Sequence, residues 1–211
     1  MMPGMRGGAR VCPLLLLALL IGGCASLRGT GVPLPLEAQQ QLLREMPGFS
    51  LRGRTKIIVT DPLTGEKNGP PNPYLTWKQQ GEKASFKLSG QFGVGQLTVT
   101  WQPGALRLEA GGQVYVDAGA EQVLVNEIGF VPPFEALRYW ILGLDAPGEP
   151  PTQRELAEDG RIQAMQQQQW HLRYRSWRSA RARGGTVELP RRLDVTRDNL
   201  SLTVLVDRWS L

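Results

Sequence analysis

Few residues of this 211-residue chain carry side chains suited to catalysis. His171 is the single histidine, and it alternates with Arg173 and Arg175 without a carboxylate nearby in sequence, as in a solvated strand rather than at a general base. One His and two Cys are too few for a zinc site with four such ligands. The glycine cluster at 90–95 lacks the spacing of a phosphate loop, and no G-x-S-x-G motif is present. We therefore predict that the protein is not an enzyme and holds no metal.

The two cysteines lie in or directly after an apolar N-terminal segment. Residues 11–21, which include Cys12, form an eleven-residue apolar run that follows Arg6 and Arg10. A helix of that length spans about 16 Å, whereas the core of a bilayer is about 30 Å thick. A basic start, a short apolar run and small residues after it are typical of a secretory signal peptide, which we predict at residues 1–23.

Cys24 follows this segment, and the Ile-Gly-Gly-Cys sequence at 21–24 resembles the bacterial lipobox. The resemblance implies cleavage before Cys24, which then carries a diacylglyceryl and an N-acyl group; no other cofactor is expected. Ala25 is not the aspartate that marks inner-membrane retention, which implies a lipid anchor at the periplasmic face of the outer membrane. The alternative is a buried structural thiol at an ordinary signal boundary. Residues 24–35 are predicted to be the lipidated cysteine and a flexible tether.

The remaining residues, 36–211, are predicted to form one domain of mostly short strands. A helix is expected at 36–46, ended by Pro47 and Gly48. Residues 61–73 have the composition of a long loop. Alternation of apolar and polar residues predicts strands at 49–59, 74–79, 84–88, 97–101, 106–108, 114–116, 169–177, 186–195 and 200–209.

Helical spacing replaces this alternation at 118–128 and 133–142, where Pro133 suits a first helical residue and Gly143 a C-terminal cap. The apolar faces of these helices need a partner, and the inner face of a curved sheet is the only large one available. The predicted fold class is mainly β with helices (α+β), with about ten antiparallel strands.

The hairpin tip at 90–95 places Phe92 and Val94 among three glycines. Phe92 either folds back onto the core or inserts into a membrane. Burial of one Phe contributes roughly 1.5–3 kcal/mol, which supports transient contact with lipid but not anchoring.

Arginine is concentrated near the C-terminus, where Arg173, Arg175 and Arg178 begin a basic stretch that extends to residue 192. The stretch is either a solvated hairpin face or a docking patch for an acidic protein, anionic lipid or lipopolysaccharide. Nucleic acid is not an expected partner of an exported protein.

Taken together, these features resemble the LolB family of outer-membrane lipoprotein receptors. The closest similarity lies in the Leu-Arg-x-Trp-Ile-Leu-Gly segment at 137–143 and in the apolar residue followed by glycine at 92–93, with weaker support from residues 51–54 and 207–209. The family commonly has Pro-Leu-Gly at the hairpin tip, where this chain has Gln-Phe-Gly at 91–93. The loop at 61–73 is also longer than usual, and the resemblance gives it no role.

The resemblance implies an open, strongly curved antiparallel β-barrel of about ten to eleven strands, with a helical lid over an apolar cavity. It implies that acylated lipoproteins arrive from a LolA-like periplasmic carrier and are inserted into outer-membrane lipid without nucleotide, by a protein expected to be a monomer. The residues expected to form the cavity and lid are Trp77, Phe86, Leu88, Leu97, Val99, Trp101, Leu124, Ile128, Phe134, Leu137, Trp140 and Ile141. The alternative is a structural or signal-sensing lipoprotein of similar fold whose interior is filled.

Overall fold

The computed structural model describes Met1, residues 31–90 and residues 95–211. The predicted signal peptide, Cys24, Phe92 and Val94 therefore lie outside the described residues. The chain divides into two compact units, and all of the elements described below belong to the unit Gly31–Leu211.

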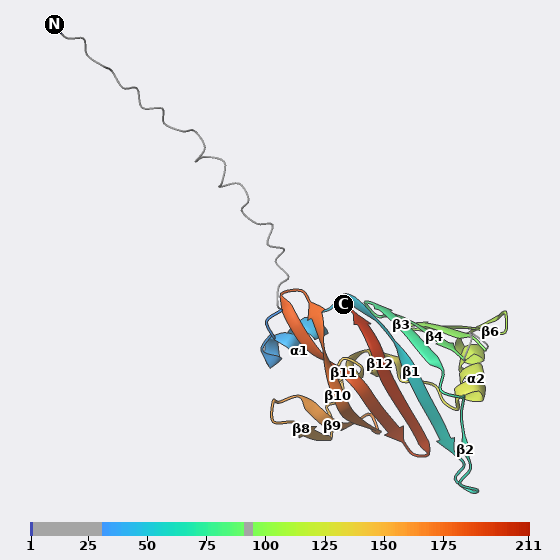
Figure 1. The fold of residues 1–211 in the computed structure, drawn as a ribbon. Helices are drawn as coiled ribbons and strands as arrows, with labels where there is room; N and C mark the ends of the chain where they lie inside the picture. The colour runs from blue at the N-terminus through green and yellow to red at the C-terminus, as the bar shows by residue number, and fades with distance from the viewer. Residues whose placement is uncertain (2–30, 91–94) are drawn as a thin grey trace. The chain divides into compact units, whose positions relative to one another are not determined.

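This unit contains three helices and a twelve-stranded antiparallel sheet (Figure 1). The helices are α1 (Leu36–Arg44), α2 (Asp117–Ile128) and α3 (Phe134–Trp140). The strands are β1 (Gly48–Thr60), β2 (Lys67–Asn68), β3 (Tyr74–Gln80), β4 (Lys83–Ser89), β5 (Leu97–Gln102), β6 (Ala105–Ala110), β7 (Gln113–Val116), β8 (Gln153–Leu156), β9 (Ile162–Gln167), β10 (Trp170–Ala182), β11 (Gly185–Arg197) and β12 (Leu200–Ser210). The order β7-β6-β5-β4-β3-β1-β12-β11-β10-β9-β8 leaves the sheet open, with β2 paired to β1. The predicted fold class is confirmed, with twelve strands in place of ten or eleven.

Three of these strands were missing from the sequence prediction because their residues lack the expected pattern. All four residues of β8 are exposed, so its sequence carries no alternation of apolar and polar positions. Strand β9 is rich in glutamine, and β2 is a two-residue pairing inside the expected loop at 61–73. The first helix ends at Arg44 rather than residue 46, and α3 is shorter than the predicted 133–142.

The start of the described unit is held against the sheet. The Leu34 amide donates to the Thr186 carbonyl, and the Thr186 amide donates to Val32, both at 3.1 Å. Val32 and Leu34, which belong to the predicted tether at 24–35, are therefore hydrogen-bonded to β11.

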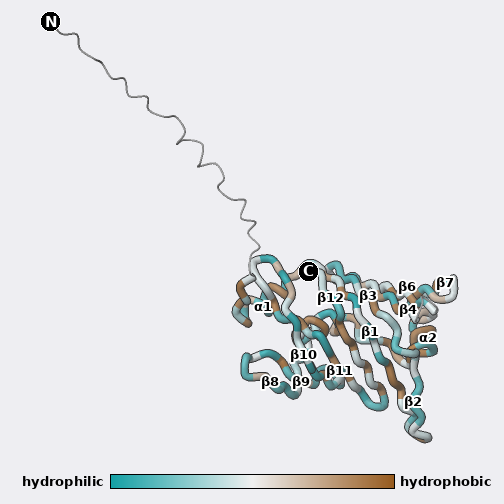
Figure 2. Tube along the Cα trace, in the orientation of Figure 1, coloured by the Kyte–Doolittle hydropathy of each residue, from teal (hydrophilic) through white to brown (hydrophobic). Residues whose placement is uncertain are grey.

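Alternation along the strands gives the sheet one apolar face (Figure 2). In β1, Leu51, Gly53, Thr55 and Ile57 are buried, whereas the lysine and arginines between them are exposed. The pairing of β1 with β12 shifts register between Arg52 and Gly53, which is the position of a β-bulge. A buried face of this kind needs a cover.

Helices α2 and α3 provide that cover. Helix α2 buries Ala120, Leu124 and Ile128 on one side and ends at Gly129, whose φ of 88° is the left-handed conformation that favours glycine. Helix α3 buries a further set of apolar side chains, Phe134, Ala136, Leu137 and Trp140. Both helices join the same core as the inner face of the sheet.

The bulge at Gly53 leads to a first prediction. A Cβ atom at this position would lie 2.1 Å from the Leu205 carbonyl oxygen in the backbone of β12. Gly53→Ala should therefore lower the free energy of unfolding by about 1–3 kcal/mol, measured by urea denaturation.

Gly119→Ala is the matched control. No atom lies within 4 Å of a Cβ built on Gly119, and its helical backbone suits alanine. This change should raise the free energy of unfolding by about 0.5 kcal/mol. Equal effects of the two substitutions would contradict the assignment of a tight backbone approach at Gly53.

Candidate functional site

The inner face of the sheet and the two covering helices enclose an apolar cavity. It measures about 80 Å³, and all of its lining side chains except Thr55 are apolar. Nine of the twelve predicted cavity and lid residues line it: Trp77, Phe86, Leu88, Val99, Leu124, Ile128, Phe134, Leu137 and Ile141. The tertiary structure thus brings most of the predicted set to one place.

The other three predicted residues lie in the surrounding packing. Leu97 is buried opposite Leu88 across the β4–β5 pair. Trp101 stacks on Phe134, with ring centroids 5.9 Å apart. Trp140 is fully buried, with its ring centroid 6.4 Å from that of Trp170.

The sequence prediction missed half of the cavity wall. The additional lining residues are Thr55, Ile57, Leu75, Phe130, Pro132, Leu193, Val195, Leu202 and Val204. Most of them are inward positions of β1, β11 and β12, which the alternation in the sequence already marked as buried. Their position beside α2 and α3 depends on the pairing of β1 with β12, which joins residues about 150 positions apart.

The size of the cavity limits what it holds in this conformation. Pockets for small organic ligands usually measure about 300–1,000 Å³. A cavity of about 80 Å³ is too small for a long acyl chain, so binding of such a chain requires the helices to move away from the sheet.

The C-terminal end of α3 is fixed by a buried polar network around Gln167. The indole Nε1 of Trp140 and the amide of Ala146 donate to Gln167 Oε1 at 2.7 and 2.9 Å. Gln167 Nε2 donates to the carbonyls of Ala146 and Glu149 at 2.8 and 2.7 Å. The side chain of Gln167 is completely buried and fully hydrogen-bonded, so it fastens the end of α3 to β9.

Tyr174 adds a second connection at the same place. Its hydroxyl donates to the carbonyl of Trp140 at 2.8 Å. Burial, with a smaller contribution from Asp145, raises the pKa of Tyr174, so the phenol stays neutral and keeps its proton for this bond.

The connection between α2 and α3 is held differently. In the described residues, the segment 129–133 makes no hydrogen bond to the sheet, and its contacts are apolar. Phe130 packs on Trp170 with ring centroids 6.0 Å apart, and Gly129 lies against Val59. This segment and the adjoining end of α2 are the parts of the lid that can move without breaking buried hydrogen bonds.

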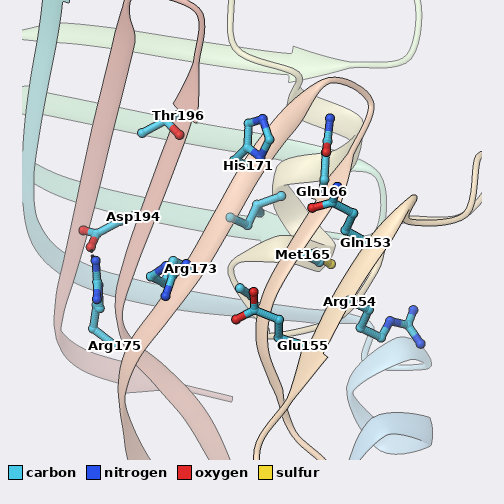
Figure 3. Close-up of a pocket in the computed structure, with 12 residues that line it drawn as sticks. Gln153, Arg154, Glu155, Met165, Gln166, His171, Arg173, Arg175, Asp194 and Thr196 are labelled. Carbon is cyan, nitrogen blue, oxygen red and sulfur yellow. Dashed lines mark hydrogen bonds and ion pairs between the residues drawn. The ribbon is translucent and has the colours of Figure 1, made fainter.

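A second hollow lies on the outer face of β8 to β11 (Figure 3). This outer groove measures about 340 Å³ and contains Arg173, Arg175 and the exposed His171. Arg175 is paired with Asp194 at 3.0 Å, whereas Arg178 lies elsewhere and donates to the carbonyl of Asp207. The three predicted docking arginines therefore do not form one free basic surface.

Asp194 compensates part of the positive charge of the groove. Burial acts to raise the pKa of Asp194, but hydrogen bonds from Arg192, Arg175 and Thr203 outweigh it and leave the pKa lowered. Arg173 has no acidic partner among the described ion pairs.

Within residues 31–90 and 95–211, no group of three or more His, Cys, Asp or Glu side chains is arranged to hold a metal ion. Over the same described residues, none of the helices combines the length and the apolar character that crossing a membrane requires.

Comparison with known proteins identifies the family of this chain. The family model described as "Outer membrane lipoprotein LolB" matches residues 49–209, which run from β1 to β12. The chain belongs to the LolB family. The "Outer-membrane lipoprotein LolB" of Cellvibrio japonicus is 32% identical, over 94% of this chain and 97% of its own length. LolB proteins of Chromohalobacter salexigens and Halorhodospira halophila are 31% and 30% identical, covering 96% and 97% of this chain and 91% and 97% of their own lengths.

The Gln167 network leads to a second prediction. Gln167→Leu removes all four hydrogen bonds and leaves the Trp140 indole and the Ala146 amide buried without acceptors. Because each unsatisfied buried group costs about 1–3 kcal/mol, the free energy of unfolding should fall by about 3 kcal/mol or more in urea denaturation.

Gln166→Leu is the matched control, since the neighbouring side chain lies in the outer groove (Figure 3). It should change the free energy of unfolding by less than about 0.5 kcal/mol. Similar losses for the two variants would argue against a specific clamp at Gln167.

Proposed function

We propose that this protein is an outer-membrane receptor that accepts acylated lipoproteins in its apolar cavity and inserts them into the membrane. The observation that carries the proposal is the cavity beneath the helices, whose lining side chains are apolar except for Thr55, in a chain of the LolB family. A LolA-like periplasmic carrier is the proposed donor, and the receptor is proposed to act as a monomer without enzymatic activity.

The energetics of acyl chains explain why such a cavity is useful. Three chains of about fifteen CH₂ groups each, at roughly 0.8 kcal/mol per group, cost roughly 36 kcal/mol to expose to water. A lipoprotein that has left the inner membrane therefore cannot diffuse freely to the outer one. Direct passage from one cavity to another keeps the chains out of water, and only the difference in affinity between carriers has to drive it. No nucleotide is needed for this step.

Opening of the lid is proposed to begin at residues 129–133. These residues and the end of α2 are held by apolar contacts, which acyl chains can replace with contacts of the same kind. The end of α3 stays in place because Gln167 and Tyr174 bind it. The cavity then widens at the side of β1, where Ile57 forms part of the wall.

Roles for the remaining predicted site residues follow from the chemistry of their side chains. Cys24 is proposed to carry the lipid anchor, with the covalent acyl groups as the only non-protein component. Phe92, with Val94, is proposed to contact membrane lipid during delivery. Arg173 is the candidate for docking an acidic carrier, since Arg175 and Arg178 already have acceptors.

A transfer assay tests this function. Mature protein with Cys24→Ser should take an acylated lipoprotein from its periplasmic carrier, measured as co-elution of cargo with receptor and loss of cargo from the carrier. Phe92→Glu should accept cargo equally well but deliver it to vesicles at least tenfold more slowly. Absence of both transfer and bound lipid would refute the proposal and favour a structural lipoprotein with a filled interior.

A disulfide that closes the lid gives a further prediction. A Cβ built on Gly129 lies 3.5 Å from the Cβ of Val59, within the range of disulfide bonds. The double variant Val59→Cys, Gly129→Cys, made with Cys24→Ser, should lose cargo acceptance at least tenfold when oxidised and regain it after reduction.

The single variant Val59→Cys is the control and should respond to neither treatment. If mass spectrometry confirms the disulfide and the oxidised protein still accepts cargo at the normal rate, the lid opens somewhere other than at residues 129–133.

A further inference from the structure

A short, well-ordered hairpin extends β1 beyond the rest of the sheet. Val59 and Thr60 pair with Asn68 and Lys67 of β2. Inside the turn, the Asp61 amide donates to the Glu66 carbonyl at 2.7 Å and the Gly65 amide donates to the Asp61 carbonyl at 2.9 Å. This is the loop at 61–73 to which the sequence resemblance gave no role.

The carboxylate of Asp61 completes the turn. Its Oδ1 accepts hydrogen bonds from the amides of Leu63 and Thr64, both at 2.8 Å. These two bonds, led by that from Thr64, lower the pKa of Asp61, so the group is ionised at neutral pH. The carboxylate thus faces the amides of its own turn, and residues 62–65, Pro-Leu-Thr-Gly, form an uncharged tip between Asp61 and Glu66.

Leu63 stands at this tip with 94% of its surface exposed, more than any other large apolar side chain that the structure describes between residues 31 and 211. Pro62 beside it is also exposed. An exposed leucine on a flat surface is common, but here the backbone of a closed turn holds it outward.

The tip lies at the cavity end of the sheet. Ile57 and Leu202, which face each other across β1 and β12, line the cavity, and Ile57 is only four residues before Asp61. Strand β4 also ends on this side, since Ser89 pairs with Tyr74 at the start of β3. In Figure 1 the hairpin at β2 projects from the end of the sheet away from α1.

We propose that residues 62–65 are a membrane-contacting tip, in which Leu63 enters the interface of a phospholipid bilayer. The proposal rests on the proposed function and adds to it a second lipid contact, which orients the cavity toward the membrane. A bilayer fits this feature better than a protein partner. A specific protein interface buries about 800 Å² on each side, and a single convex turn offers far less surface. A bilayer, in contrast, can accommodate one inserted apolar side chain without a large matching surface.

A fluorescent label at the tip provides a direct test. The sequence contains only Cys12 and Cys24, so a mature chain with Cys24→Ser and Leu63→Cys has one thiol. Labelled with an environment-sensitive nitrobenzoxadiazole dye, it should show a blue shift and an intensity gain with vesicles of phosphatidylethanolamine and phosphatidylglycerol at 3:1. The same label at Leu156→Cys, an exposed leucine of β8, should show neither change.

Vesicle flotation measures how much the Leu63 side chain contributes to membrane binding. Leu63→Glu, in the Cys24→Ser chain, should bind vesicles about tenfold more weakly, while Leu156→Glu binds as the parent does. Both should unfold at the parent's urea concentration because both side chains are exposed. Leu63→Glu should still accept cargo from the carrier.

Three results would overturn the proposal: an unshifted dye at residue 63, unchanged flotation of Leu63→Glu, or a dimer in sedimentation that Leu63→Glu dissociates. Failure of the parent chain to accept cargo would instead count against the proposed function, and the dye and flotation results would still decide whether the tip binds lipid.

Discussion

An open antiparallel sheet with one apolar face cannot remain exposed to water, and the rest of this structure follows from how that face is covered. Burial of Leu51, Ile57 and their inward neighbours is worth about 25 cal/mol for each Å² removed from water. Hydrogen bonding of the edge strands β7 and β8 to each other would close the sheet into a full barrel and also bury these side chains, but the sheet is open. Helices α2 and α3 cover the face with apolar side chains instead, and an apolar cover can be exchanged for acyl chains at little cost.

The cover is attached unequally along its length: the end of α3 is held by hydrogen bonds, and the connection between α2 and α3 by apolar contacts. Gln167 and Tyr174 bind the end of α3 through buried hydrogen bonds, which are expensive to break without replacement. Residues 129–133 are held by Phe130 and other apolar contacts, which have no such directional requirement. The opening proposed at residues 129–133 would therefore leave the hydrogen bonds of Gln167 and Tyr174 intact.

Two surface aspartates each compensate the charge of two arginines. Asp194 pairs with Arg175 and Arg192, and Asp145 pairs with Arg44 and Arg154. Ion pairs at such exposed positions contribute little to stability, but they reduce the net charge of the outer groove. The exposed apolar tip at Leu63 is therefore a more distinctive feature of the surface than the arginine-rich stretch near the C-terminus.

The sequence by itself determined the fold class, the family and the inward residues of the helices, because these depend on local periodicity and on short motifs such as that at 137–143. It predicted nine of the cavity residues but not Val195 or Leu202. It grouped Arg178 with Arg173 and Arg175, whereas only Arg173 and Arg175 line the outer groove. Only the tertiary structure decided these points. Strand pairing brings β1 beside β12, a bulge shifts their register at Gly53, and the hydrogen bonds of Gln167 join segments that no local pattern connects.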